Sequence, residues 1–176
     1  MIELSAAIPG YFLGSIPFGL VLAKLSGYGD IRKIGSGNIG ATNVLRTGNK
    51  LLALAVLILD SGKGAAAVLM AYRFGSPEAA ITAGLFAIIG HMFPVWLKCK
   101  GGKGVATTLG MLLALAPTVG VSACIAWLLT AAIFRYSSLA ALIAILAAPP
   151  LAHIIYADPA LTGVCGLITL LVWFKH

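Results

Sequence analysis

The sequence is poor in charge. Only 10% of its 176 residues are charged, whereas 60% are hydrophobic, and its mean hydropathy is +1.03. A soluble domain carries roughly 25% charged residues and cannot bury so much apolar surface. The shortage of charge therefore excludes an ordinary soluble globular protein and predicts one that is solvated by a lipid bilayer.

Cysteine is scarce as well. Cys99, Cys124 and Cys165 match no metal-binding spacing and are odd in number, so we expect reduced thiols that pack as small hydrophobic side chains. Neither a metal nor a cofactor is expected. The net charge of +7 would suggest nucleic acid in a soluble protein. In a membrane protein it indicates loop orientation and attraction to anionic head groups and substrates, so no nucleic-acid partner is predicted.

Seven apolar segments fit membrane-spanning helices, because about 20 residues cross roughly 30 Å of hydrocarbon. They are predicted at 4–25, 51–73, 79–97, 105–117, 118–134, 139–156 and 160–175. The fourth is short and ends at Pro117, so a broken or re-entrant pair with the fifth is an alternative. The N-terminus lacks the basic start of a signal peptide, so the first segment is expected to be a retained span. The sequence thus predicts an all-α, polytopic membrane protein with a single domain over 1–176.

The basic residues fall unevenly on alternate loops. Ten of the 12 lie on one side of the predicted membrane: Lys24, Arg32, Lys33, Arg46, Lys50, Lys98, Lys100, Lys103, Arg135 and Lys175. The other side holds Arg73 with the acidic Glu3, Glu78 and Asp158, and Lys63 lies within a span. The positive-inside rule then predicts an N-terminus outside and a cytoplasmic C-terminus.

Residues 35–46, called loop 1 below, join the first two predicted spans. Gly35, Gly37 and Gly40 satisfy the GxGxxG pattern, but no strand precedes them, so a dinucleotide site is rejected. Glycines still allow backbone N–H groups to approach an anion, and a helix N-terminus after them adds a favourable dipole. A flexible polar linker is the alternative, but such a density of polar residues and glycine in an apolar chain favours a phosphate-binding site.

Side chains of loop 1 supply further groups for an anion. Ser36, Thr42 and Asn43 offer neutral donors, Asn38 lies among them, and Arg46 offers a planar fork for phosphate oxygens.

Residues 98–107, called loop 2 below, form a second glycine-rich and basic segment. It contains Gly101-Gly102-Lys103-Gly104, which differs from a nucleotide-binding P-loop because Lys103 is followed by glycine and not by Ser or Thr. Nucleotide hydrolysis is therefore not expected. Three glycines beside lysines predict a backbone nest that holds phosphate. An ordinary positive-inside loop would explain the lysines but not the glycines.

Asp60, Lys63 and His91 are candidate site residues that lie within predicted spans. Asp60 and Lys63 are spaced to share one helix face. Because ionisable groups at membrane depth are costly, they are expected to pair, either structurally or with Lys63 lining a substrate groove. His91 near loop 2 is a candidate substrate-binding residue, with a packing role as the alternative. Arg135 and Ser138 are candidates for one wall of the same site.

A transporter of a phosphate-containing or other anionic molecule is the alternative function, with Asp60 and Lys63 as its intramembrane coupling residues. Transporters tend to contain internal repeats and to bind near the midplane, whereas here the phosphate-like groups gather in loops on one side. A structural scaffold would leave both glycine-rich loops unexplained. The pattern therefore favours an enzyme at the membrane interface.

Several motifs occur together and in order. They are Gly14-Ser15-Ile16-Pro17-Phe18-Gly19, residues 35–46, Asp60-x-x-Lys63-Gly64, Gly90-His91-Met92-Phe93-Pro94 with residues 101–107, and Arg135-Tyr136-x-Ser138-Leu139. Over nearly the whole chain these motifs resemble the bacterial acyl-phosphate:glycerol-3-phosphate acyltransferases. The resemblance implies a seven-span inner-membrane enzyme with a cytoplasmic active site. It also implies transfer of a fatty acyl group from acyl phosphate to the 1-hydroxyl of glycerol 3-phosphate, which yields lysophosphatidic acid for phospholipid synthesis.

The resemblance also assigns roles to residues. Ser36 and Arg46 match the essential serine and arginine of the family's first motif, and residues 101–104 with Lys103 match its glycerol-3-phosphate and phosphate site. Lys175 and His176 match the start of a third motif, which puts His176 among the catalytic residues. In the family that motif continues to an asparagine and a glutamate, so we expect a chain that is truncated at its C-terminus or that acylates poorly.

Overall fold

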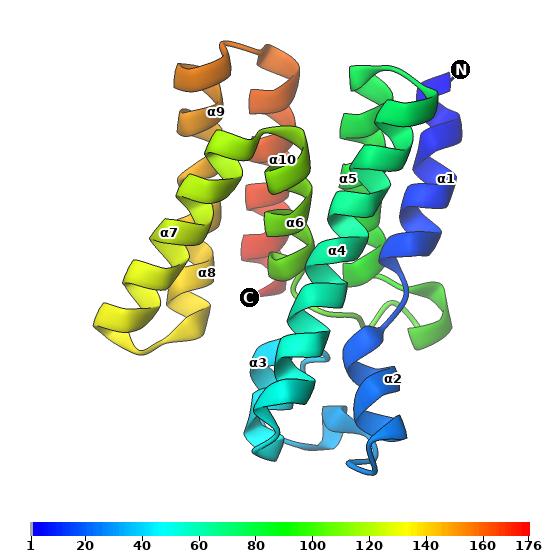
Figure 1. Cartoon of the computed structure of the whole chain (residues 1–176), viewed down its shortest axis with the longest axis vertical. Coiled ribbons are helices and arrows are strands. Elements are labelled where there is room, and N and C mark those ends of the chain that lie inside the picture. The colour runs from blue at the N-terminus through cyan, green and yellow to red at the C-terminus, as the bar shows by residue number, and fades with distance from the viewer. Residues whose placement is uncertain (1) are drawn as a thin grey trace.

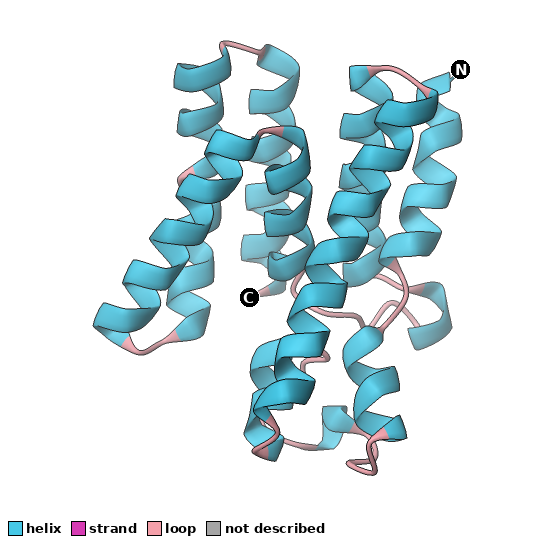
Figure 2. Cartoon of the chain, in the orientation of Figure 1, coloured by secondary structure: helices cyan, strands magenta, loops and turns pink. Residues whose placement is uncertain are grey.

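The computed structural model describes residues 2–176, with side chains from Ser5 onward, so the side chain of Glu3 lies outside the described part. In chain order the helices are α1 (Ile2–Gly14), α2 (Phe18–Leu25), α3 (Ala41–Val44), α4 (Lys50–Phe74), α5 (Pro77–Met92), α6 (Val105–Leu115), α7 (Pro117–Phe134), α8 (Ser137–Leu146), α9 (Ala148–Tyr156) and α10 (Pro159–Lys175). Short 3-10 turns are η1 (Ile31–Lys33), η2 (Leu45–Thr47) and η3 (Val95–Leu97). The described residues form no strand, and the all-α prediction is confirmed (Figure 2).

The helices agree closely with the predicted spans. Five helical segments are long and apolar enough to cross a bilayer: Ser5–Leu25, Lys50–Phe74, Pro77–Leu97, Pro117–Phe134 and Ser137–Tyr156. Val105–Leu115 and Pro159–Lys175 are shorter apolar helices at the two remaining predicted positions. The prediction of seven spans therefore has five full-length candidates and two short ones, and the orientation of the termini across a membrane stays a prediction.

The first predicted span is broken between Gly14 and Phe18. α1 ends at Gly14 and α2 begins at Phe18. Pro17 has no N–H group to continue the helical hydrogen bonds, so the chain changes direction there. Three of the other long helices begin at side-chain caps. The side chains of Asn49, Ser76 and Asp158 accept backbone N–H groups at the starts of α4, α5 and α10.

The connections alternate between two ends of the molecule (Figure 1). The turns α4–α5, α6–α7 and α9–α10 lie at the upper end, where α1 also begins. Residues 26–49 lie at the lower end, and loop 2 crosses the molecule at mid-height, near the C-terminus. The short helices η1, α3 and η2 lie in the polar segment 26–50 that joins the first two predicted spans.

Small residues let the helices pack with their backbones in contact. A Cβ atom on Gly110 of α6 would overlap the carbonyl oxygen of Ser61 on α4, and one on Gly14 of α1 would overlap that of Ala87 on α5. Such close approach through small residues is how helices associate in lipid, where the hydrophobic effect does not draw them together.

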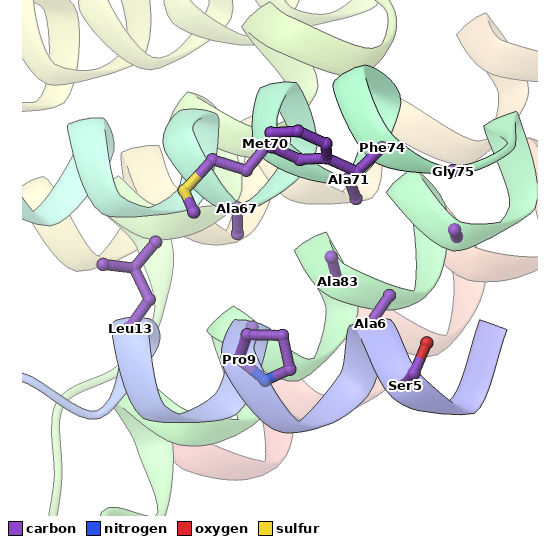
Figure 3. A pocket seen from close by; sticks show the side chains of 12 residues that line it. Ser5, Ala6, Pro9, Leu13, Ala67, Met70, Ala71, Phe74, Gly75 and Ala83 are labelled. Carbon is purple, nitrogen blue, oxygen red and sulfur yellow. The ribbon is translucent and has the colours of Figure 1, made fainter. Parts of the chain in front are cut away.

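A pocket of about 290 Å³ lies between α1, α4 and α5 (Figure 3). Its lining is almost entirely apolar and includes Leu13, Ala67, Met70 and Phe74. Ala67, Met70 and Phe74 belong to the second half of α4, which ends at the turn to α5 at the upper end of the molecule (Figure 1). The pocket is therefore separate from the polar end of the molecule.

The glycine contacts predict an asymmetry between two Gly→Ala variants. Gly110→Ala should lower the free energy of unfolding by about 1–3 kcal/mol, because its methyl group meets the backbone of Ser61, which cannot move aside. Gly163→Ala in α10 is the control, since a Cβ there meets nothing within 4 Å. Thermal unfolding in detergent measures both. Equal melting temperatures for the two variants would contradict the close α4–α6 contact.

Candidate anion-binding site

Loop 1 is organised by the buried side chain of Asn43. Its Nδ2 group donates to the carbonyl oxygens of Ile31 and Ile34, at 2.9 and 3.1 Å. Its Oδ1 atom accepts from the backbone N–H of Ser36 at 3.0 Å and from the Ser36 hydroxyl at 3.3 Å. Because these bonds use both ends of the amide, Asn43 holds the loop together and is not a free donor for a ligand.

Gly35 allows Arg46 to cross loop 1. Gly35 has φ +55°, and a Cβ there would overlap Asn43 Oδ1 and lie 2.6 Å from Cδ of Arg46. Arg46 and Ser36 are exposed at this surface. The structure therefore brings together Gly35, Ser36, Asn43 and Arg46.

The rest of loop 1 contributes less than its motif suggested. Gly37 has φ +70°, which explains the glycine. Gly40 precedes α3, which has only four residues, so the helix dipole that was predicted after the glycines is small. Asn38 and Thr42 belong to the same loop, and their roles in binding remain predictions.

Loop 2 differs from the predicted nest in one respect. The N–H groups of Gly101 and Gly102 already donate to the carbonyls of Met92 and His91, at 3.1 and 3.0 Å. A Cβ on either glycine would overlap His91, at its carbonyl oxygen or at Nε2. The prediction that these two N–H groups face an anion is therefore wrong. Both residues are glycines because they pack against His91.

The backbone N–H groups that are free in this segment are those of residues 103–106, directly after Gly102. Thr108 N–H makes the first bond of α6, to Gly104, so the N–H groups of Val105 and Ala106 have no partner within the helix. Within the described residues, those of Lys103 and Gly104 have no acceptor either. These four N–H groups precede an 11-residue helix, which is an arrangement suited to an anion.

Side chains from three elements meet near this helix start. Nζ of Lys103 donates to Oγ of Ser138, at the start of α8, at 3.4 Å. Burial lowers the pKa of Lys103. Burial also lowers the pKa of His176, and the nearby charge of Lys103 lowers it further. Nδ1–H of His176 donates to the Val172 carbonyl at 2.9 Å, which leaves Nε2 as an acceptor.

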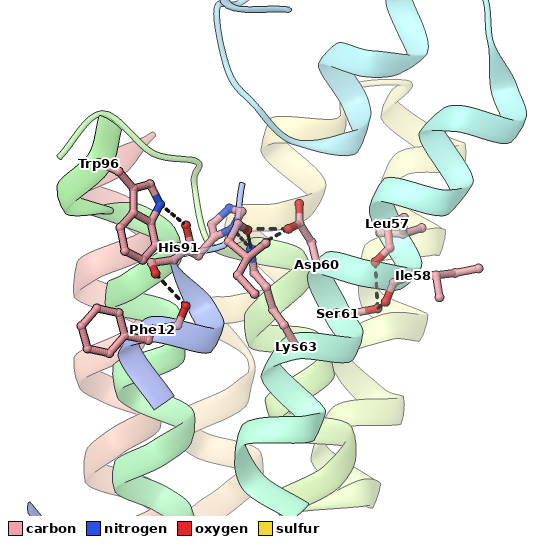
Figure 4. Close-up of polar contacts among 10 residues, drawn as sticks. Phe12, Leu57, Ile58, Asp60, Ser61, Lys63, His91 and Trp96 are labelled. Carbon is pink, nitrogen blue, oxygen red and sulfur yellow. Dashed lines mark hydrogen bonds and ion pairs between the residues drawn. The ribbon is translucent and has the colours of Figure 1, made fainter. Parts of the chain in front are cut away.

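Lys63 and His91 do not lie freely in this site. With Asp60 they form the buried triad, in which each residue is at most 5% exposed (Figure 4). Nζ of Lys63 donates to Asp60 Oδ1 at 2.6 Å, to the Ile16 carbonyl at 2.8 Å and to His91 Nδ1 at 2.8 Å. The predicted pairing of Asp60 with Lys63 is confirmed. Because all three donors of Lys63 are used, a direct bond to substrate would require one of these bonds to break.

Two aromatic residues that the sequence reasoning missed hold the segment before loop 2. Tyr11 on α1 donates its hydroxyl to the Phe93 carbonyl at 2.8 Å and accepts the Val95 N–H at 3.1 Å. Trp96 donates Nε1–H to the Ser15 carbonyl at 2.8 Å. Aromatic residues with a polar tip near a span end were the available signal.

The two loops are joined through packing. Leu97 of η3 packs against the apolar cluster beneath loop 1, which includes Ala23, Ile31 and Ile39. Within the part of the chain that the structure describes, the Arg46 side chain makes no hydrogen bond or ion pair, and the Lys103 side chain makes one hydrogen bond, to Ser138. Both cations therefore remain available to a ligand.

These features define a class: a helical membrane protein with cations and free N–H groups gathered in loops of one half of the molecule. The family model for glycerol-3-phosphate acyltransferase matches residues 4–176, and the chain belongs to this family.

Similar proteins and solved structures belong to the same family. Glycerol-3-phosphate acyltransferases of Rhodospirillum rubrum and Agrobacterium fabrum are 59% and 55% identical to the chain. Each match covers 97% of the chain, with 82% of the first protein and 83% of the second. Crystal structures of the integral membrane enzyme PlsY, in glycerol 3-phosphate and lysophosphatidic acid forms, have TM-scores of 0.92 and 0.90 at 39% and 38% identity. Each covers 99% of this chain, with 88% and 87% of the PlsY chains. A transporter is not favoured.

Asn43→Leu tests the scaffold of loop 1. The variant removes the acceptor of the Ser36 N–H and one of the two donors to each of the carbonyls of Ile31 and Ile34, which keep a backbone N–H. At about 1 kcal/mol for each lost bond, hydrogen exchange over residues 31–43 should accelerate by about two orders of magnitude. Asn38→Leu is the matched control, because no side-chain hydrogen bond of Asn38 occurs among the described residues. Unchanged exchange in Asn43→Leu would show that another contact holds the loop.

Proposed function

We propose that the protein transfers a fatty acyl group from acyl phosphate to the 1-hydroxyl of glycerol 3-phosphate, giving lysophosphatidic acid and phosphate. The observation that carries this proposal is the pair of cation-bearing loops, with Arg46 exposed in loop 1 and Lys103 beside free N–H groups in loop 2. Both substrates are anions, so cations and N–H groups are the groups they require. Membership in the acyltransferase family supports the same reaction.

The reaction needs no strongly activated nucleophile, because acyl phosphate is a mixed anhydride and already reactive. The 1-hydroxyl oxygen of glycerol 3-phosphate attacks the acyl carbonyl carbon, and a C–O ester bond forms. The bond from that carbon to the phosphate oxygen breaks, and phosphate leaves with the electron pair. The hydroxyl proton goes to a substrate phosphate oxygen. Arg46, Ser36 and Lys103 stabilise the departing phosphate, while Ser138 supports Lys103.

His176 contributes as a neutral group. Its lowered pKa keeps the imidazole uncharged at neutral pH, and its Nδ1–H is bonded to Val172. Nε2 is then an acceptor beside Lys103, suited to orient a substrate hydroxyl.

Direct attack is favoured over an acyl-serine intermediate on Ser36. The Ser36 hydroxyl donates to the amide oxygen of Asn43 at 3.3 Å, and an amide is not a base. A nucleophilic serine requires an adjacent base such as histidine. Trapping a covalent acyl enzyme during turnover would overturn this mechanism.

We also propose a location in the bacterial inner membrane with loops 1 and 2 on the cytoplasmic side. Support comes from the basic residues, which gather in segments of one half of the molecule, while Arg73, Glu78 and Asp158 lie near the other end. Glycerol 3-phosphate would then reach the site from the cytoplasm.

The donor is tested by an assay in detergent with glycerol 3-phosphate and three acyl donors in parallel. Acyl phosphate should yield lysophosphatidic acid with stoichiometric phosphate, whereas acyl-CoA and acyl carrier protein thioesters should yield none. Transfer from a thioester at an equal rate would contradict the proposed donor.

Two substitutions test the phosphate-binding cations. Arg46→Ala and Lys103→Ala should each lower kcat/KM by about 10–100-fold, the loss expected for a charge-assisted hydrogen bond of about 1.5–3 kcal/mol. Lys100→Ala is the control, because Lys100 is an exposed lysine of the same loop and should change kcat/KM less than about threefold. Full activity in either test variant would remove that residue from the site.

The lowered pKa of Lys103 predicts a pH dependence. Lys103 binds phosphate only as an ammonium ion, and burial favours its neutral form. As pH rises through the lowered pKa, the charge is lost, so kcat/KM should fall at a lower pH than an exposed lysine would give. Lys103→Arg keeps its charge over this range and should show no such fall. Superimposable profiles for the two proteins would contradict this assignment.

A further inference from the structure

We propose that the buried triad of Asp60, Lys63 and His91 fixes the placement of loop 1 relative to loop 2 and so sets the turnover rate. Lys63 is its centre and contacts the break between α1 and α2, its own helix α4, and α5 (Figure 4). The triad residues are positioning residues in this proposal, which rests on the proposed function.

The triad is connected to loop 1 through Ile16 and α2. The Ile16 carbonyl, which accepts from Lys63, precedes Pro17 and the start of α2. Two residues into α2, a Cβ on Gly19 would overlap the carbonyl oxygen of Ile39 in loop 1. The ring of Phe18 lies 5.5 Å from Nζ of Lys63 and adds a cation–π contact. Lys63 therefore determines where α2, and loop 1 packed on it, lie.

The triad is connected to loop 2 through His91. An ammonium group can only donate, so Nδ1 of His91 accepts and Nε2 carries the proton. That edge of the ring lies against Gly102, where a Cβ would overlap Nε2. The His91 carbonyl also accepts the Gly102 N–H at 3.0 Å. His91 thus holds Gly102 from two sides, next to Lys103.

The helix packing alone does not require this charge pair. α4 and α6 already meet through Gly64 and Gly110. Burying two charges has a desolvation cost, and apolar residues of similar volume often pack as well or better. What an apolar pair cannot do is fix the direction of the Ile16 carbonyl and of the His91 ring.

The expected kinetic effect follows from this geometry. Transfer requires the hydroxyl oxygen within about 3–3.5 Å of the carbonyl carbon, and a displacement of about 1 Å can lower the rate about 100-fold. Each loop keeps its own hydrogen bonds without the triad, through Asn43 in loop 1 and Met92 in loop 2. Loss of the triad should therefore change KM less than it changes kcat.

The test is the double variant Asp60→Leu/Lys63→Met, which removes both charges together and leaves neither one buried alone. Arg73→Met is the matched control, an exposed cation on the same helix α4. We expect the double variant to lose about 10–100-fold in kcat, with KM for both substrates within about threefold and its melting temperature close to that of the wild type. The control should match the wild type in all four quantities.

A folded double variant with wild-type kcat, or one that changes KM alone, would overturn the proposal. If the double variant does not fold, His91→Phe decides, because it keeps an aromatic ring without the Nδ1 acceptor and leaves Lys63 its two oxygen acceptors. It should lower kcat about tenfold, and wild-type kcat in this folded variant would also overturn the proposal.

Assays of the wild-type protein distinguish a failure of this proposal from a failure of the proposed function. If wild-type protein uses only a thioester donor, the acyl phosphate assignment fails, and the triad is tested with that donor. If the wild type transfers no acyl group from any donor, the proposed function fails and the triad proposal fails with it.

Discussion

The buried ammonium of Lys63 is the interaction on which the polar half of the molecule depends. A charge within a span must be paired, and here one carboxylate, one carbonyl and one imidazole surround it. The carbonyl is that of Ile16, in the break between α1 and α2. In an uninterrupted helix that oxygen would accept the N–H four residues on. The break in the first span and the buried lysine are therefore one structural feature.

The glycine-rich loops use their glycines mainly for packing. Gly35 lets Arg46 cross loop 1, while Gly101 and Gly102 lie against His91. The groups available to an anion are then the side chains of Arg46 and Lys103 and the N–H groups at the start of α6. A glycine-rich motif beside lysines predicts a phosphate site, and that site stays a prediction. In the folded chain, Gly35, Gly101 and Gly102 serve packing instead of the close approach to an anion that the motif suggests.

The spans could be predicted because hydrophobic runs, prolines and capping residues are local signals. The break before Pro17 coincides with a local signal of the same kind, since proline lacks the N–H group that a helix needs. The arrangement of the candidate site was less predictable, because it depends on contacts between distant residues. Lys63 and His91 are 28 positions apart, and no local pattern shows that they bond. Asn43 likewise looks like a ligand donor in sequence, and only the folded loop uses both ends of its amide.

Differences in helix length place part of the candidate site above the lower end of α4. α6 and α10 are shorter than α4, and their lower ends stop at mid-height, so Lys103 and His176 lie above the lower end of α4 (Figure 1). The lower part of α4 exposes large apolar side chains, including Leu51, Leu54 and Ile58. The apolar surface of α4 therefore extends below the level of Lys103. A substrate with an acyl chain in the bilayer and a phosphate at its end matches that combination of apolar surface and recessed positive charge.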